Sequence, residues 1–367
     1  MIWALLALAC DGPAEEVPAI VYPEGFPELR VPADNPLTAE KIELGRYLFY
    51  DVRLSGNETQ SCGSCHEQEL AFTDGRTVGE GSTGELHPRN ANGLSNVGYN
   101  ATLTWANPIL TEIEGQLLLP LFGEEPVELG AGAYRDEILV RLAEDPEMLA
   151  RFQAAFPDDV DPVTWERTIQ AIASFTRILI SGNSPFDQFN YQGNAAALST
   201  AQIRGLSLFY SEELECHHCH GGFNFSEASV HAGTVFDASF FQNTGLYNVD
   251  GQGAYPPNNT GLYEITADPA DMGKFRAPSL RNVQVTGPYM HDGSMETLDE
   301  VIRFYERGGR LIESGEYAGD GAESPLKSGL VAGFELTDQE RADLVEFLEA
   351  LTDEDFLTDP ALSDPFK

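Results

Sequence analysis

Apolar residues recur at helical spacing in four stretches of the chain, and the four stretches form two similar pairs. The first pair covers residues 36–50 and 198–210; in each, a Leu lies five residues before an Ile, and Gly-x-x-Leu-Phe-Tyr follows. The second pair covers residues 165–180 and 337–351, where the apolar residues fall on one face of a helix. We therefore predict a mainly α-helical protein with an internal repeat, in which one helix opens and another closes each half.

A turn-rich stretch over 181–194 separates the two halves. We place the domain boundary within it, which gives an N-terminal domain over 36–190 and a C-terminal domain over 191–367, after a leader and linker over 1–35. Residues 221–290 hold many Gly, Asn and Pro and show little periodicity. We expect long loops in that region, with at most short strands.

Each half also carries the same short chemical motif after its first helix. The motif is Cys62-Gly-Ser-Cys65-His66 in the first half and Cys216-His-His-Cys219-His220 in the second. In C-x-x-C-H, the two cysteine sulfurs bond the vinyl groups of one porphyrin, and the histidine binds its iron. A single C-x-x-C also occurs in redox dithiols and in half zinc sites. Two copies, each with its own histidine and with no further cysteine pair, predict two covalent c-type haems.

The charge of the chain restricts its partners. The 367 residues carry a net charge of −38, which repels nucleic acid and anionic lipid. Such a surface suits a basic protein partner or a saline habitat, or is simply a uniformly solvated acidic surface. Four of the five cysteines belong to the haem motifs, so we expect no structural disulfide.

The first ten residues form a short apolar run that ends at Cys10. The run is too short to span a bilayer as a helix. It resembles the end of a bacterial lipoprotein signal, with Cys10 as a lipid anchor, although no Lys or Arg precedes it. A cleaved signal and an ordinary N-terminus are the alternatives. Covalent haem attachment independently predicts a periplasmic or other extracytoplasmic location.

The two motifs, the repeated helices and the block Phe275-Arg-Ala-Pro-Ser-Leu-Arg-Asn to Gly-Pro-Tyr-Met-His-Asp-Gly293 resemble the bacterial di-haem cytochrome c peroxidase family, which includes MauG. The resemblance covers residues 36–352. It implies two tandem cytochrome c-type domains, each with a covalent haem surrounded by long loops. It also implies that hydrogen peroxide is a substrate.

The resemblance implies a second axial ligand for the C-terminal haem. In the peroxidases of the family this ligand is a Met, fourteen residues after the histidine that corresponds to His291; Tyr305 stands there in this chain, as it does in MauG-like members. A soft thioether favours ferrous iron, whereas a hard phenolate favours ferric and higher oxidation states. We expect His220 and Tyr305 to bind this iron. Alternatively, Tyr305 is a packed aromatic residue and Met290 or Met295 is the ligand.

The haem on His66 is implied to be the peroxide site, with Glu128 as the acid/base and Gln116 as an orienting group. The reaction needs one group that moves a proton between the two peroxide oxygens. A carboxylate in an apolar haem pocket has its pKa raised toward that task. An insertion of two residues leaves Glu124 and Glu125 as alternatives, and the three glutamates together also fit a solvated acidic loop.

Residues between the haems are implied by the same resemblance. Trp105 is similar to the inter-haem tryptophan of the family, which relays an electron hole, and it is alternatively a core residue of a domain interface. Asn90 and the carbonyls of Thr286 and Pro288 match a calcium site, and calcium prefers such oxygen ligands. His87 lies near a loop whose histidine caps the N-terminal iron in some peroxidases. We expect that iron to be open here.

MauG passes holes to its protein substrate through a surface tryptophan, and residues 212–215 carry Glu-Glu-Leu-Glu where that residue would stand. Residues 96–108 and 216–225 look most like the MbnH branch, whose members are implicated in oxidising a tryptophan on a small secreted copper-binding partner. We predict oxidation of a partner protein's side chain. A plain peroxidase that takes electrons from a small redox protein, and an electron-transfer cytochrome, are the alternatives. We expect His217 and His218 to be surface or packing residues.

Overall fold

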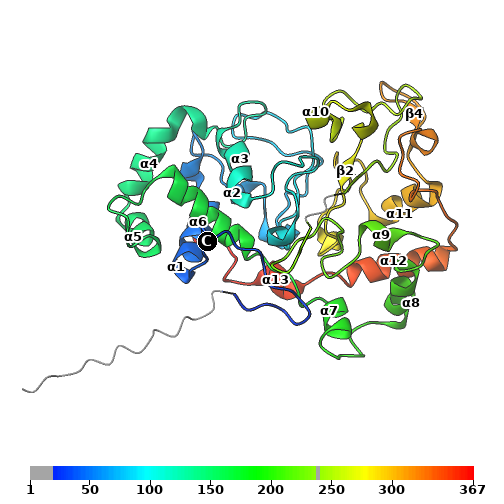
Figure 1. Ribbon diagram of the computed structural model, residues 1–367, viewed down its shortest axis with the longest axis horizontal. Helices are drawn as coiled ribbons and strands as arrows, with labels where there is room; N and C mark the ends of the chain where they lie inside the picture. The colour runs from blue at the N-terminus through cyan, green and yellow to red at the C-terminus, as the bar shows by residue number, and fades with distance from the viewer. Residues whose placement is uncertain (1–19, 237–239) are drawn as a thin grey trace, which may run out of the picture.

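The structure is a computed structural model that describes residues 20–236 and 240–367 (Figure 1). Among these residues helices dominate, and the strands are only two residues long. The α-helices are α1 (Ala39–Tyr50), α2 (Ile113–Gln116), α3 (Leu118–Phe122), α4 (Arg135–Ala143), α5 (Pro146–Ala155), α6 (Trp165–Arg177), α7 (Pro185–Asn190), α8 (Thr200–Phe209), α9 (Cys216–Cys219), α10 (Tyr263–Thr266), α11 (Leu298–Arg307), α12 (Asp338–Glu349) and α13 (Glu354–Thr358). The prediction of a mainly α-helical protein is confirmed.

The four predicted helices correspond to α1, α6, α8 and α12, each shorter than predicted by a few residues at its ends. Each begins after a Ser or Thr whose side chain accepts a hydrogen bond from the backbone three residues on. Such caps satisfy a free N–H group of the first turn and fix where the helix starts. These N-caps are Thr38, Thr164, Ser199 and Thr337.

The repeated glycine of the sequence pattern lies where the two long helices of each half touch. A Cβ atom on Gly45 of α1 would lie 1.9 Å from the carbonyl oxygen of Ala171 in α6. A Cβ atom on Gly205 of α8 would lie 2.0 Å from the carbonyl oxygen of Asp343 in α12. Only glycine allows this approach, so the pattern specifies the same helix pair in both halves.

Two hydrophobic cores follow from these pairs. The first surrounds Leu48 and Phe175, and the second surrounds Phe209 and Phe347. In the long loops between α8 and α11, β1 (Phe241–Gln242) pairs antiparallel with β2 (Phe275–Arg276). Further along, β3 (Leu311–Ile312) pairs with β4 (Gly319–Asp320). The expectation of loops with at most short strands over 221–290 is confirmed for the residues of this range that the structure describes.

The end of the chain returns to the first core. Phe356 and Leu357 of α13 and the following Leu362 are buried there, although they are far in sequence from the rest of that core. The Tyr50 hydroxyl donates to the Leu362 carbonyl at 2.8 Å, and the Gln68 amide donates to the Phe356 carbonyl at 3.1 Å. Figure 1 shows the C-terminus beside α1 and α6. The last part of the predicted C-terminal domain therefore packs against the first core.

A polar seam joins the two halves near residue 281. Arg281 and Asp187 form a buried ion pair, with Nη1 and Oδ2 2.5 Å apart and both side chains fully buried. The Asn282 amide donates to the hydroxyls of Ser95 and Ser181, at 2.9 and 3.0 Å. The halves are therefore held in a defined arrangement, while their exact boundaries stay a prediction.

Within the described residues, no helix is long and apolar enough to cross a membrane. The predicted lipid anchor, Cys10, lies outside the described residues.

Candidate functional site

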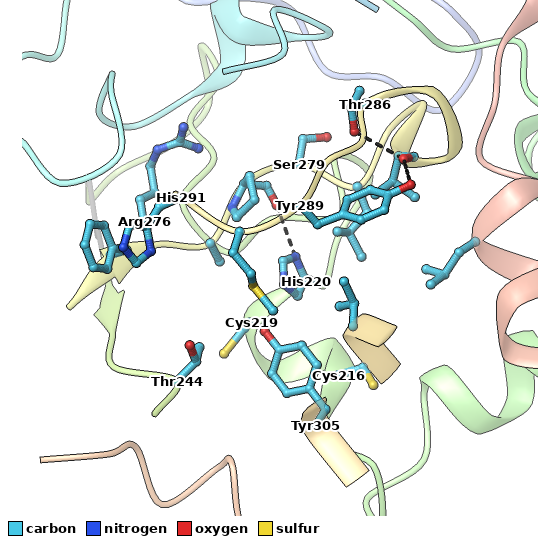
Figure 2. Close-up of a pocket in the computed structure, with 18 of the residues that line it drawn as sticks. Cys216, Cys219, His220, Thr244, Arg276, Ser279, Thr286, Tyr289, His291 and Tyr305 are labelled. Carbon is cyan, nitrogen blue, oxygen red and sulfur yellow. Dashed lines mark hydrogen bonds between the residues drawn. The ribbon is translucent and has the colours of Figure 1, made fainter. Parts of the chain in front are cut away.

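The second C-x-x-C-H motif borders a large cavity (Figure 2). Cys216 and Cys219 of α9 and the following His220 form one wall, and the loop over 275–291 and helix α11 form others. The cavity is partly open to solvent, and its lining is mostly apolar. An apolar lining beside two cysteines suits a macrocycle tethered to them.

Hydrogen bonds prepare His220 to bind a metal. Its Nδ1 lies 3.2 Å from the Phe225 carbonyl oxygen and 3.1 Å from that of Pro278. A ring nitrogen facing two carbonyl acceptors carries the proton, which leaves the Nε2 lone pair free for iron. Burial also lowers the pKa of His220, which favours the neutral form that metals bind.

The first motif has the same arrangement. The Nδ1 atom of His66 lies 2.7 Å from the Phe72 carbonyl oxygen, and burial lowers the pKa of this imidazole as well. A capping box between Ser61 and Ser64 fixes the short turn that begins at Cys62. Both motifs therefore present a neutral histidine with a free Nε2, which is what two haem irons require.

An unpaired cation lines the cavity of the second motif. The Arg276 side chain is only 4% exposed, and within the described part of the chain its Nη1 has no hydrogen-bond partner. The Nε2 atom of His291 is buried and unpartnered in the same way. Figure 2 shows the two side chains together on one side of the cavity. The guanidinium donates to the Thr104 carbonyl at 3.1 Å and to the Asn92 side-chain oxygen at 3.4 Å, but no carboxylate among the described residues pairs with it. A buried cation without a counter-charge is costly, so these groups fit the propionates of a haem. No pattern in the sequence points to the role of Arg276.

Tyr305 reaches the cavity from α11, whose start is fixed by a capping box between Thr297 and Glu300. Figure 2 shows its ring beside Cys219, with the hydroxyl directed toward His220. Met290 also lines the cavity. Met295 is buried and is not among the described residues that line the cavity. The candidate ligands are thereby reduced to Tyr305 and Met290.

Burial raises the pKa of Tyr305. A ferric ion opposes this effect, because a bound cation favours the phenolate over the phenol. The cavity itself therefore holds a neutral phenol, and ligation by Tyr305 couples iron binding to the loss of one proton.

Glu128 lies at the first motif. The segment that carries it is fixed to the loop over 79–87, since the Ser82 N–H donates to the Glu128 carbonyl at 2.7 Å and the Val127 N–H donates to Glu85 at 3.0 Å. Burial, with a smaller contribution from the nearby Glu128 charge, raises the pKa of the Cys62 thiol to about 12. The carboxylate is thus close to the haem attachment point.

The environment of Glu128 distinguishes it from its neighbours. Desolvation by the surrounding protein raises its pKa to about 7, although 39% of the side chain remains reachable by solvent. Glu124 and Glu125 are exposed. Of the three glutamates considered, Glu128 alone combines partial burial with a pKa suited to proton transfer near neutral pH.

His87 lies next to Glu128, a contact that the sequence did not predict. Its Nε2 lies 3.7 Å from the Glu128 Oε1, and its Nδ1 accepts a hydrogen bond from the Arg89 N–H at 3.3 Å. The proton of the neutral ring is therefore on Nε2, facing the carboxylate. Burial and the Arg89 charge lower the pKa of His87, so the ring stays neutral at pH 7. Forty-one residues separate the pair in sequence, and no local pattern connects them.

Gln116 ends α2, which lies directly before α3. No hydrogen bond joins its side chain to Glu128 among those of the described residues. The role of Gln116 as an orienting group therefore stays a prediction.

The residues expected between the haems do lie together. The Trp105 indole N–H donates to the Asn90 carbonyl at 2.8 Å, and Trp105 lines the cavity with Asn90, Thr286 and Pro288. The Asn90 amide donates to the Arg76 carbonyl at 2.7 Å, which directs its oxygen away from that contact. Calcium at this place stays a prediction.

His217 and His218 of α9 lie next to the carboxylates of Glu212 and Glu215 respectively. Three potential ligand atoms of Glu212, His217 and His218 lie within 4.8 Å of one another. The two imidazole rings are tilted, with centroids 4.2 Å apart and planes 34° apart. The expectation that both histidines are surface or packing residues stays a prediction.

Comparison with known proteins gives a consistent answer. The family profile described as "Di-haem cytochrome c peroxidase" matches residues 39–196. The chain is 35% identical to cytochrome-c peroxidase IdrP1 of Denitromonas iodatirespirans, over 92% of this chain and 87% of the relative. It is 31% identical to the methylamine utilization protein MauG of Methylorubrum extorquens, over 90% of this chain and 82% of the relative.

A solved structure agrees more closely still. It is titled "Crystal structure of a MauG-like protein associated with microbial copper homeostasis" and superposes with a TM-score of 0.92 at 52% identity, covering 94% of this chain and 99% of that one. Two neutral histidines behind C-x-x-C motifs, an apolar cavity beside the second of them, and these relatives lead to one conclusion. The chain belongs to the di-haem cytochrome c peroxidase and MauG family of peroxide-dependent oxidoreductases.

Proposed function

We propose that this protein is a MauG-like oxidoreductase of the MbnH type, which uses hydrogen peroxide to oxidise a side chain, such as that of tryptophan, on a partner protein. One observation carries the proposal: Tyr305 lines the haem cavity, with its hydroxyl directed toward His220 (Figure 2). A phenolate ligand favours ferric and higher oxidation states over the ferrous state. The 52% identity to a MauG-like protein supports the same choice.

The residues divide the work between two sites. Cys62, Cys65 and His66 would hold one haem, and the second motif with Tyr305 would hold the other. When bound, the haems supply iron that exchanges electrons, the first of them reacting with hydrogen peroxide. Glu128 takes a proton from one peroxide oxygen and returns it to the other, so that water leaves.

The protein also supports this proton transfer around Glu128. The neutral His87 keeps its Nε2 proton toward the carboxylate, which favours the ionised form that acts as a base. Gln116 is proposed to orient the peroxide. Trp105, held by its hydrogen bond to Asn90, is proposed to pass an electron between the two haem sites. Calcium bound by Asn90, Thr286 and Pro288 would stiffen this region.

The second candidate is a plain cytochrome c peroxidase that reduces peroxide with electrons from a small redox protein. It is favoured by the relatives named cytochrome-c peroxidase, and by Met290, which lines the same cavity as Tyr305. A thioether ligand would raise the reduction potential of the second haem. An electron-transfer cytochrome without peroxide chemistry does not fit the two relatives named above, which are a cytochrome-c peroxidase and MauG.

A redox titration of the diferric holoprotein separates the two candidates. The MauG-like function requires the second haem to stay oxidised in ascorbate, and hydrogen peroxide to change the spectra of both haems. Easy reduction of the second haem by ascorbate would establish the plain peroxidase instead.

We further propose a periplasmic location, with a lipid anchor at Cys10. Covalent haem attachment supports the compartment. The net charge of −38 suits a secreted partner with a basic surface.

A further inference from the structure

Aromatic residues form a continuous row from the inter-haem tryptophan toward the surface. The Trp105 and His291 ring centroids are 6.4 Å apart, and those of His291 and Tyr255 are 6.3 Å apart. The row continues from Tyr255 to Tyr247 at 5.4 Å and from Tyr247 to Tyr317 at 6.2 Å. Its first member lines the haem cavity, whereas Tyr317 is partly exposed on the β3–β4 hairpin.

We propose, on the basis of the function proposed above, that this row carries oxidising equivalents from Trp105 to Tyr317, where the partner protein is oxidised. Electrons move in the opposite direction, from the partner through Tyr317 and Tyr247 to Trp105. Hydrogen peroxide is the final oxidant and takes two electrons and two protons as it becomes two waters.

The hydrogen bonds assign different roles to the tyrosines. A tyrosine that loses an electron near neutral pH also gives up its phenolic proton, so a relay position needs a proton acceptor. The Tyr247 hydroxyl donates to the Asp292 carboxylate at 2.6 Å, and this carboxylate can take the proton and return it. Tyr317 is partly exposed, so solvent serves there.

Tyr255 is a bridge rather than a relay position. Its hydroxyl donates to the Asn243 amide oxygen at 2.9 Å and accepts from the Leu246 N–H at 3.1 Å. An amide oxygen is a poor proton acceptor, so Tyr255 keeps its proton. The buried ring, like that of His291, fills the space between Trp105 and Tyr247 with aromatic atoms instead of solvent.

A glycine-lined contact holds Tyr247 against the hairpin that carries Tyr317. A Cβ atom on Gly321 would lie 1.8 Å from the Gly245 carbonyl oxygen, and one on Gly319 would lie 2.2 Å from the Asn248 carbonyl oxygen. The two backbones therefore touch on both sides of Tyr247. Figure 1 shows β4 at the outer edge of the molecule, so the row ends where a partner can dock.

This route explains how holes leave a protein that has Glu-Glu-Leu-Glu at 212–215, where MauG has its surface tryptophan. The proposed exit, Tyr317, lies on the β3–β4 hairpin rather than beside α9. Two charges act on the Tyr247 ring: the Arg310 guanidinium, 5.8 Å from the ring centroid, opposes a positive charge there, whereas the Asp292 carboxylate at the hydroxyl favours it.

The test treats the diferric holoprotein with hydrogen peroxide in the absence of a partner and maps oxidised tyrosines by peptide mass spectrometry. Tyrosyl radicals are followed by electron paramagnetic resonance. We expect oxidation products at Tyr317 and Tyr247, and none at Tyr134, which is 42% exposed but lies outside the row. Tyr247→Phe should abolish the products at Tyr317 and leave the initial haem spectral change intact. Tyr134→Phe is the matched control and should leave Tyr317 oxidation unchanged.

Two results overturn the relay alone: unchanged Tyr317 oxidation in Tyr247→Phe, or no Tyr317 products in a wild-type protein whose haems respond to peroxide. If the haem spectra do not respond to peroxide at all, the proposed function fails and the relay fails with it.

Discussion

The substitution Glu128→Gln tests the proposed acid/base directly. The amide keeps the size of the side chain and removes its ability to take a proton. Loss of a positioned acid/base typically slows a reaction about 10²–10⁴-fold. We expect a loss of that size in the second-order rate constant for hydrogen peroxide, measured by stopped-flow absorbance of the diferric holoprotein.

The raised pKa of Glu128 makes the pH dependence more diagnostic than the rate at one pH. Glu128 acts as a base, so the active form is the carboxylate, and the rate falls as the pH drops below the pKa. With a pKa of about 7, the carboxylate fraction is about 1% at pH 5 and about 90% at pH 8, a change of nearly a hundredfold. With the ordinary value of 4.5, the same change in pH would alter that fraction by less than about twofold.

The exposed Glu124 and Glu125 provide matched controls. Their substitution by Gln should leave both the rate and the pH profile within a few-fold of wild type. The reasoning is refuted if Glu128→Gln retains the wild-type rate, or if the wild-type rate is flat between pH 5 and pH 8.

Three further predictions concern the second half of the chain. Tyr305→Met should allow ascorbate to reduce the second haem, because a thioether favours ferrous iron; a redox titration measures this. Gly205→Ala should destabilise the fold by about 1–3 kcal/mol in urea unfolding, because the added Cβ would lie 2.0 Å from the Asp343 carbonyl oxygen. Arg281→Met should lower the free energy of unfolding by about 3–5 kcal/mol, because it leaves the Asp187 charge buried without its partner.

Each of these has a clear opposite outcome. A titration of Tyr305→Met that coincides with wild type would remove Tyr305 as a ligand. An unchanged unfolding midpoint for Gly205→Ala would mean that α8 and α12 move apart to accommodate the added Cβ atom without a loss of stability. An Arg281→Met protein as stable as wild type would mean that Asp187 takes up a proton or gains water.

The helices and the haem motifs were predictable because their signals are local. Gly45 and Gly205 lie in the same six-residue pattern, and the caps at Thr38 and Ser199 lie just before their helices. Each of these features is specified by residues within one or two turns of one another. The cysteines and histidines of the two motifs are equally local.

The rest of the site depends on contacts between distant parts of the chain. His87 meets Glu128 only because the loop over 79–87 is fixed to the segment that carries Glu128. The unpaired Nη1 of Arg276 lines the cavity only because the loop over 275–291 and α9 lie on the same cavity. The residues of the aromatic row come from several loops without regular secondary structure, so no sequence periodicity predicts the row. Such features follow from the fold and are not readable from neighbouring residues.

The return of α13 to the first core has a consequence for biosynthesis. Phe356, Leu357 and Leu362 fill space beside the helices around the first motif, yet they are synthesised after nearly all of the second half. A nascent chain that has released only its first half exposes an apolar surface that those three side chains later cover. Completion of the N-terminal lobe therefore waits for the synthesis of α13, and a protein truncated before α13 would lose packing around the first motif rather than around the second.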